Sequence, residues 1–203
     1  MITTIFNRIF ISIMIGIYIM GFLVPVMIIK KKGKDPHGTH EGSSILTRFS
    51  SISIGLWFLY LILFIIFGDL ISSFLYIPIF NSDIFIIIGM ILMSVSFIFE
   101  LLATLYLGYN FRIELPKEDI ELITSGIYRI MRNPIVFGLY LLILGSFFII
   151  PTIINLLLFI INLITFNSKV KDEEKFLLKA FDEEYMHYKI RVGRYFPLLK
   201  KSI

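Results

Sequence analysis

The chain has 203 residues, no cysteine and a formal net charge of +4. Its hydrophobic fraction is 57%, whereas soluble globular chains hold roughly 45–50% even with glycine counted. This composition excludes a disordered protein, and the lack of cysteine excludes a disulfide scaffold or a thiolate metal site. Because the apolar residues form runs too long for a water-soluble core, we expect a small multi-pass membrane protein.

Five apolar runs approach the roughly 20 residues that a helix needs to cross a bilayer. The fourth and fifth runs are short and are separated by Pro151, so they predict a tight helical hairpin. The five runs cover about residues 5–29, 45–67, 84–108, 135–150 and 152–166. We predict an all-α integral membrane fold with about five transmembrane helices and a cytoplasmic C-terminal helix. It would form one domain over residues 1–203, with three helices in 1–108 and the loop, hairpin and tail in 109–203.

The basic residues are distributed very unequally between the two sides of these helices. Segments 30–48, 109–133 and 168–203 hold 18 of the 19 Lys and Arg residues, and the opposite side holds only Arg8. The positive-inside rule therefore predicts a cytoplasmic C-terminus and an outside N-terminus. The positive charge then reflects topology and attraction to anionic lipid head groups, so we expect the bilayer as a partner and no nucleic acid.

The first basic loop, residues 30–41, contains two histidines and two acids. A metal site there is conceivable, but metal ligation needs three or four convergent ligands and the rest of the chain supplies no clear others. A solvated loop with turn residues is the preferred interpretation, and we predict no metal.

The segment before the fourth helix reads LITSGIYRIMRNP over residues 122–134. Pro134 suits the first turn of a helix, where its missing N–H is not needed. The start of that helix offers free N–H groups and the positive end of the helix dipole to an anion, with Tyr128, Arg129 and Arg132 nearby. Alternatively, both arginines are interfacial anchors and Tyr128 belongs to an aromatic belt.

The tail predicts a cytoplasmic helix from Lys169 to near Arg191. It carries acids in its first turns, which suit the helix dipole or could face a cationic ligand. The residues 192–197 then break the helix and return aromatic side chains to the membrane surface. One apolar and aromatic face recurs at spacings of three and four: Leu177, Leu178, Phe181, Tyr185 and Tyr188.

Glu100 is an ionisable residue inside the third apolar run, and such a residue is costly in a membrane and often functional. Ser96, Thr104 and Gly108 share its helix face, and Asn155 and Asn162 share a face of the fifth helix. We expect these faces to point into the bundle and to form hydrogen bonds between helices. The alternative is that Glu100 lines the active site or a substrate tunnel.

The 122–134 segment and the tail together resemble the signature of the isoprenylcysteine carboxyl methyltransferases and the related phospholipid methyltransferases. The resemblance covers about residues 105–200 and includes the hairpin between the two motifs. In the tail it rests on Glu173, Glu174, Leu177, Phe181, Glu183, Glu184, Tyr185, Tyr188, Arg191, Val192 and Pro197. The family usually has a tyrosine where this chain has Val136, and Tyr140 could substitute one turn later.

The resemblance implies a membrane enzyme that uses S-adenosyl-L-methionine and reaches a lipidated or lipid-like substrate. Arg132 and Glu100 are the candidate catalytic residues, and Lys169 is the candidate substrate-binding residue. Glu173 would bind the cofactor from the tail, with Glu174 as second choice. The other implied cofactor-binding residues are Leu122, Ile123, Tyr128, Asn133, Pro134, Ile135 and Val136.

The residue types fit this cofactor. Helix N–H groups with Arg129 or Arg132 suit its carboxylate, a tail acid suits its ammonium, and Tyr128 or Tyr185 suits the adenine or sulfonium. A carboxylate acceptor, as in isoprenylcysteine, needs no general base, whereas an amine acceptor does, and Glu100 would be the candidate. Two rival functions stay open: an NADPH-dependent membrane reductase of the steroid-reductase type, and a non-catalytic membrane scaffold or small transporter.

Overall fold

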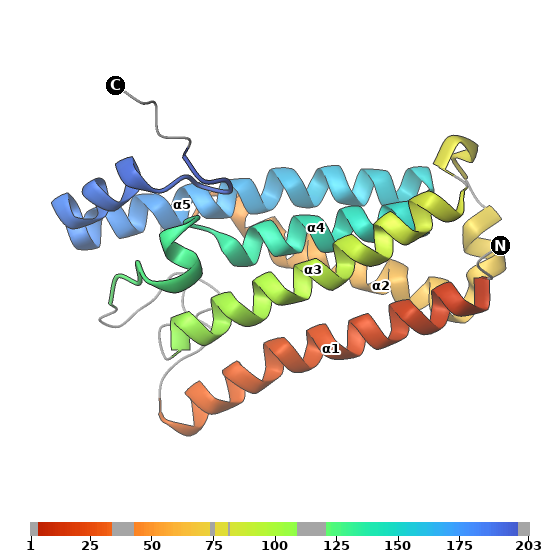
Figure 1. Cartoon of the computed structure of the whole chain (residues 1–203), viewed down its shortest axis with the longest axis horizontal. Helices are drawn as coiled ribbons and strands as arrows, with labels where there is room; N and C mark the ends of the chain where they lie inside the picture. The colour runs from red at the N-terminus through yellow and green to blue at the C-terminus, as the bar shows by residue number, and fades with distance from the viewer. Residues whose placement is uncertain (1–3, 34–42, 74–75, 81, 109–120, 199–203) are drawn as a thin grey trace.

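The computed structural model describes residues 4–33, 43–73, 76–80, 82–108 and 121–198. These residues form a bundle of long helices that run along one axis (Figure 1). The helices are α1 (Thr4–Lys31), α2 (Ile45–Ser73), α3 (Asp83–Leu107), α4 (Pro134–Ile149) and α5 (Ile153–Arg191), with short 3-10 turns η1 (Pro78–Phe80) and η3 (Gly126–Arg129). The predicted all-α membrane fold is confirmed, because within the described residues four helices are long and apolar enough to span a bilayer and α4 is a shorter apolar helix.

The predicted hairpin of α4 and α5 is confirmed. Pro151 lies between the two helices, and the Thr152 side chain begins α5 by accepting a hydrogen bond from the Asn155 N–H at 3.2 Å. Residues 76 and 77 pair with this turn. Tyr76 forms an isolated antiparallel bridge with Thr152, and the Ile77 N–H donates to the Pro151 carbonyl at 2.8 Å.

The prediction of a separate tail helix beginning at Lys169 is wrong, because α5 continues from the membrane segment to Arg191. The chain has no glycine or proline between Pro151 and Gly193, so nothing terminates the helix near Phe166. Its backbone departs from helical geometry only at Asp182, where φ is 39°. The amphipathic face is as predicted, since Tyr185, Tyr188 and Val192 are buried together and Leu177, Leu178 and Phe181 pack against them.

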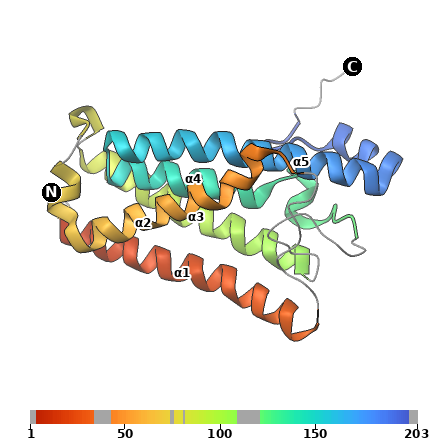
Figure 2. The same ribbon diagram turned by 180° about the vertical axis from the view of Figure 1, so that it is seen from behind.

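Two kinds of interface hold the bundle together. α3 and α4 approach closely at Gly89 and Gly145, where an added Cβ on Gly89 would lie 2.6 Å from the Gly145 carbonyl oxygen. α2 and α5, which run side by side in Figure 2, are joined by hydrogen bonds instead. Ser53 of α2 donates to the buried Asn162 of α5 at 3.0 Å, which confirms the prediction that the α5 asparagines face the interior.

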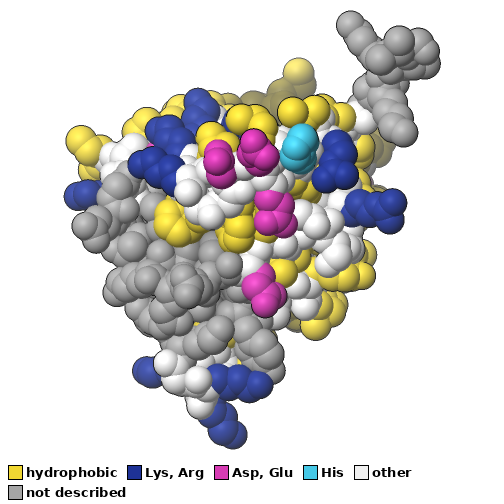
Figure 3. All heavy atoms as spheres, turned by 90° about the vertical axis from the view of Figure 1, so that its left-hand side faces the viewer, with side chains coloured by type: hydrophobic (Ala, Val, Ile, Leu, Met, Phe, Trp, Pro, Cys, Tyr) yellow, Lys and Arg dark blue, Asp and Glu magenta, His cyan; other side chains and the backbone are white. Residues whose placement is uncertain are grey.

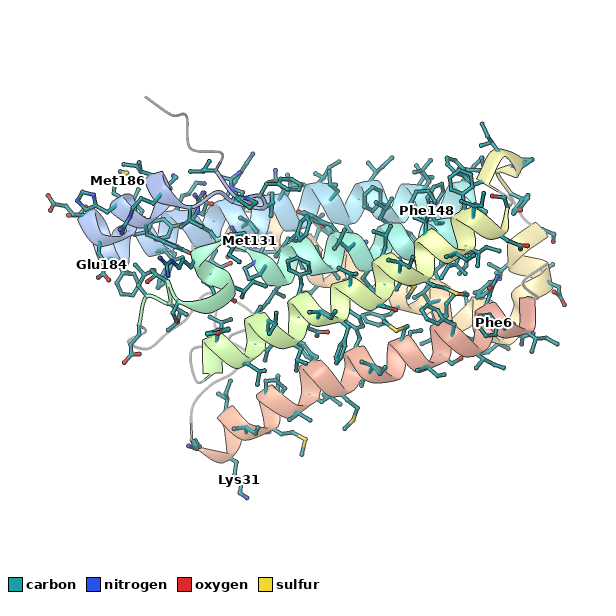
Figure 4. All side chains as sticks on the ribbon, in the orientation of Figure 1. Phe6, Lys31, Met131, Phe148, Glu184 and Met186 are labelled. Carbon is teal, nitrogen blue, oxygen red and sulfur yellow. The ribbon has the colours of Figure 1, made fainter. Side chains whose placement is uncertain are left out.

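Most of the described charged residues lie at one end of the bundle. Lys31 and Glu184 lie at this end and Phe6 at the other (Figure 4). Viewed from the end, this face carries Lys, Arg, Asp and Glu side chains, as Figure 3 shows. The distribution agrees with the asymmetry in the sequence, while the assignment of this end to the cytoplasm stays a prediction.

Candidate functional site

The candidate site lies where the turn before α4 meets the end of α5. Met131 forms an isolated parallel bridge with Gly193, and the N–H groups of Arg132 and Asn133 donate to the Gly193 and Arg194 carbonyls at 2.9 and 3.0 Å. Figure 4 shows Met131 between the η3 segment and the far part of α5. Two segments that are distant in the sequence are thereby held side by side.

Tyr128 is held in place by the last turns of α5. Its side chain is 7% exposed and packs with Ala103 and Ile127, while Ile123 and Ile135 lie against this cluster. The Tyr188 hydroxyl donates to the Tyr128 carbonyl at 2.6 Å. The sequence motif therefore forms a buried aromatic contact, and its backbone is anchored by the tail.

Glu173 and Glu174 have different environments although they are adjacent. Glu174 is buried and accepts hydrogen bonds from Arg132 Nη2 at 2.7 Å and from Arg194 Nε and Nη2 at 2.9 and 2.6 Å. Burial alone would raise the pKa of the Glu174 carboxyl, but the two guanidinium groups outweigh it and lower the pKa. Glu173 is exposed on the same part of α5.

The carboxylate of Glu173 lies close enough to affect Tyr128. Burial raises the pKa of the Tyr128 hydroxyl well above its ordinary value, and the charge of Glu173 raises it further. Glu173 also raises the pKa of Tyr185, after the larger effects of burial and Glu174. The structure thus brings an exposed carboxylate to an aromatic cluster, which is a suitable environment for a cationic group.

The N-terminus of α4 lies at the same place. Asn133 precedes the helix, and Pro134 occupies its first turn. The Asn133 side chain makes no cap hydrogen bond and instead donates to the Arg194 carbonyl at 3.4 Å. The first N–H groups of the helix, at Ile135 and Val136, are therefore not capped by the Asn133 side chain, and such a helix start suits an acceptor such as a carboxylate.

Arg132 has structural partners, which sequence reasoning missed. Its side chain is 8% exposed, and Nη1 donates to the carbonyls of Lys189 and Val192 while Nη2 pairs with Glu174. Arg132 therefore satisfies backbone carbonyls at the C-terminal end of α5 and also neutralises the charge of Glu174. No sequence signal identifies a pair separated by 42 residues, because spacing reveals only local partners.

Of the other residues predicted from the sequence, some lie at the site and others lie outside it. Leu122 packs against the Tyr185 and Tyr188 cluster. Lys169 lies about one turn before Glu173 on α5, and its Nζ is 5.9 Å from the ring centroid of Phe166. Glu100 is not part of this cluster, because its carboxyl faces Gly21 of α1. The histidines of the 30–41 loop, His37 and His40, lie outside the described residues.

Residues 84–184, which include α3, the turn before α4, the hairpin and most of α5, match the family model of phospholipid methyltransferases. Through this segment, which is about half of the chain, the protein matches the phospholipid methyltransferase family. The resemblance inferred from the two motifs is therefore confirmed.

Two curated relatives extend this result. The protein-S-isoprenylcysteine O-methyltransferases of Saccharomyces cerevisiae and Schizosaccharomyces pombe are each 31% identical over 84 residues, which is 41% of this chain. The aligned part covers 35% and 36% of the two relatives. The chain thus spans about a third of the length of the curated relatives it matches.

Proposed function

We propose that the protein is a membrane methyltransferase that transfers a methyl group from S-adenosyl-L-methionine to a lipidated or lipid-like acceptor. One observation carries the proposal: Glu173, Tyr128 and the start of α4 at Pro134 converge at one end of the bundle, within the segment that matches the family. The relatives named as isoprenylcysteine O-methyltransferases support an acceptor that carries a lipid.

The proposed cofactor fits the donor set. The exposed Glu173 carboxylate would accept hydrogen bonds from the amino acid ammonium, and the first N–H groups of α4, with the exposed Arg129, would donate to its carboxylate. Tyr128 and Tyr185 would contact the adenine or sulfonium. Leu122, Ile123, Ile135 and Val136 would complete the apolar wall, with Asn133 beside them. When bound, S-adenosyl-L-methionine supplies an electrophilic methyl group.

The chain's contribution to the reaction would be mainly positioning. In-line methyl transfer gains much of its rate from holding donor and acceptor in the correct orientation. A carboxylate acceptor is already ionised near neutral pH, so no base is needed for it, whereas an amine would have to lose a proton. In this proposal Arg132 is a positioning residue rather than a catalytic one, Glu174 stabilises it, and Lys169 contacts the acceptor.

NADPH is a poorer fit than S-adenosyl-L-methionine at this site. Its phosphates require several converging cations, but Arg132 and Arg194 are both paired with Glu174. The test is to incubate membranes containing the protein with radiolabelled methyl donor and to extract lipid and protein fractions. We expect label in a lipid or lipidated protein, and a loss of at least about tenfold in Glu173→Gln. Labelling equal to that of control membranes would contradict the proposal.

A further inference from the structure

An apolar groove runs between α1 and α3, on the side of α3 away from α4. Its volume is about 800 Å³, and its walls come from Ser12 to Ile29 of α1 and from Phe97 to Gly108 at the end of α3. The α1 wall spans about 26 Å, taking 1.5 Å per residue. α1 and α3 run side by side toward the end that carries Lys31 (Figures 1 and 4). The groove is long, narrow and apolar, which suits an aliphatic chain.

One acid interrupts this apolar lining. Glu100 is the single charged residue among the described residues that line the groove, and they include no Lys or Arg. Its Oε2 is buried and has no hydrogen-bond partner in the described part of the chain. An added Cβ on Gly21 would lie 3.4 Å from both carboxyl oxygens, so α1 has a glycine directly opposite the acid.

The backbone of α1 opposite the acid lacks one helical hydrogen bond. Pro25 lies inside α1 and has no N–H, so the carbonyl of Gly21 lacks the donor from residue i+4 that an α-helix normally supplies. Gly21 itself lines the groove opposite the Glu100 carboxyl. An unpaired acid in a membrane is costly, and a ligand that donates hydrogen bonds and carries positive charge would offset this cost.

We propose that the α1–α3 groove binds a lipid whose aliphatic chain lies along α1 and whose amine or ammonium group pairs with Glu100. The apolar walls accommodate the chain, and the unpaired carboxyl oxygen of Glu100 selects a donor-rich cation over an acid or an alcohol. That this lipid is the methyl acceptor rests on the proposed function, whereas the binding itself does not.

The proposal can be tested by photolabelling the full chain in detergent without any methyl donor. The probe is hexadecylamine with a diazirine in its chain, and the competitors are unlabelled hexadecylamine, palmitate and hexadecanol. We expect the labelled peptides to come from α1 and α3. Unlabelled hexadecylamine should reduce this labelling at concentrations at least about tenfold lower than palmitate or hexadecanol. Equal competition by all three, or labelling outside α1 and α3, would overturn the proposal.

Two variants and a control separate the contributions of charge and shape. Glu100→Gln keeps the side-chain size, so it should remove the preference for the amine while chain labelling persists. Gly21→Leu should block the groove and reduce all labelling, whereas Gly55→Leu adds the same side chain to α2, where no atom lies within 4 Å of the added Cβ, and should change nothing. An unchanged amine preference in Glu100→Gln, with the variant folded by circular dichroism, would refute the role of the acid. Cofactor binding is measured separately, so a failure of the proposed function would not be confused with a failure of this site.

Discussion

Arg132 and Glu174 form a buried ion pair at 2.7 Å, with their side chains 8% and 7% exposed. Arg194 completes the group from the segment that follows α5. The three residues join the turn before α4 to the middle and the end of the tail. The geometry of the candidate site thus depends on a largely buried charged cluster.

Removing one partner of this ion pair should destabilise the protein. In Arg132→Ala the Glu174 charge loses a buried partner, which costs about 3–5 kcal/mol in comparable pairs. We expect a lower midpoint of thermal unfolding in detergent together with lost activity. Lys175→Ala is the control, since the Lys175 side chain is 74% exposed and its pair with Asp172 is worth at most about 1 kcal/mol. An inactive Arg132→Ala with unchanged stability would instead indicate direct catalysis by Arg132.

The hydrogen bond from Tyr188 to Tyr128 should affect cofactor binding indirectly. Tyr188→Phe leaves the buried Tyr128 carbonyl without this donor, a loss of about 1–3 kcal/mol. We expect weaker binding of S-adenosyl-L-methionine by titration calorimetry. Tyr185→Phe is the matched control, because the described contacts of Tyr185 are through its ring. Equal affinity in Tyr188→Phe and the unmodified protein would show that this anchor is unimportant.

The close approach of α3 and α4 predicts opposite effects for two glycine substitutions. Gly89→Ala places a methyl group 2.6 Å from the Gly145 carbonyl oxygen and should destabilise the bundle by about 1–3 kcal/mol. Gly55→Ala meets no atom within 4 Å and should be neutral or stabilising by less than about 1 kcal/mol. Thermal unfolding of the two variants side by side checks this, and a tolerated Gly89→Ala would contradict the packing.

Acid should weaken the contact between α2 and α5. Burial would raise the pKa of Asp172, but hydrogen bonds from Thr47, the Ser44 N–H and Lys175 lower it to about 2. Because the pKa is lower in the folded state, its contribution is complete above about pH 4 and is lost as the pH falls toward 2. The stability of the unmodified protein should therefore drop over this range by roughly 2 kcal/mol more than that of Asp172→Asn. Parallel pH profiles of unfolding for the two proteins would contradict the assignment.

The sequence predicted the helices and the hairpin because long apolar runs and Pro151 are local signals. It predicted the aromatic face of the tail for the same reason, since spacings of three and four place residues on one helix face. It did not predict that α5 is continuous, because the change from apolar to charged residues suggested a boundary that the backbone does not have.

Partners distant in the sequence were not predictable. Periodicity placed Ser96 and Glu100 on one face, but it could not show that Ser96 pairs with Tyr18 of α1 while Glu100 lines a groove. Likewise, the motif indicated that Arg132 is near the site, but only the fold shows that Glu174 and the end of α5 occupy its donors. The identity of a partner depends on tertiary packing, which no single segment encodes.

The central claim is that a methyl donor binds where Tyr128, the start of α4 and Glu173 meet. The most direct measurement is titration calorimetry of S-adenosyl-L-methionine into the purified protein and its Glu173→Gln and Glu184→Gln variants. Saturable binding that weakens at least about tenfold in Glu173→Gln and is unchanged in Glu184→Gln is the expected result. The claim would be contradicted by an absence of binding, or by equal affinity in all three proteins.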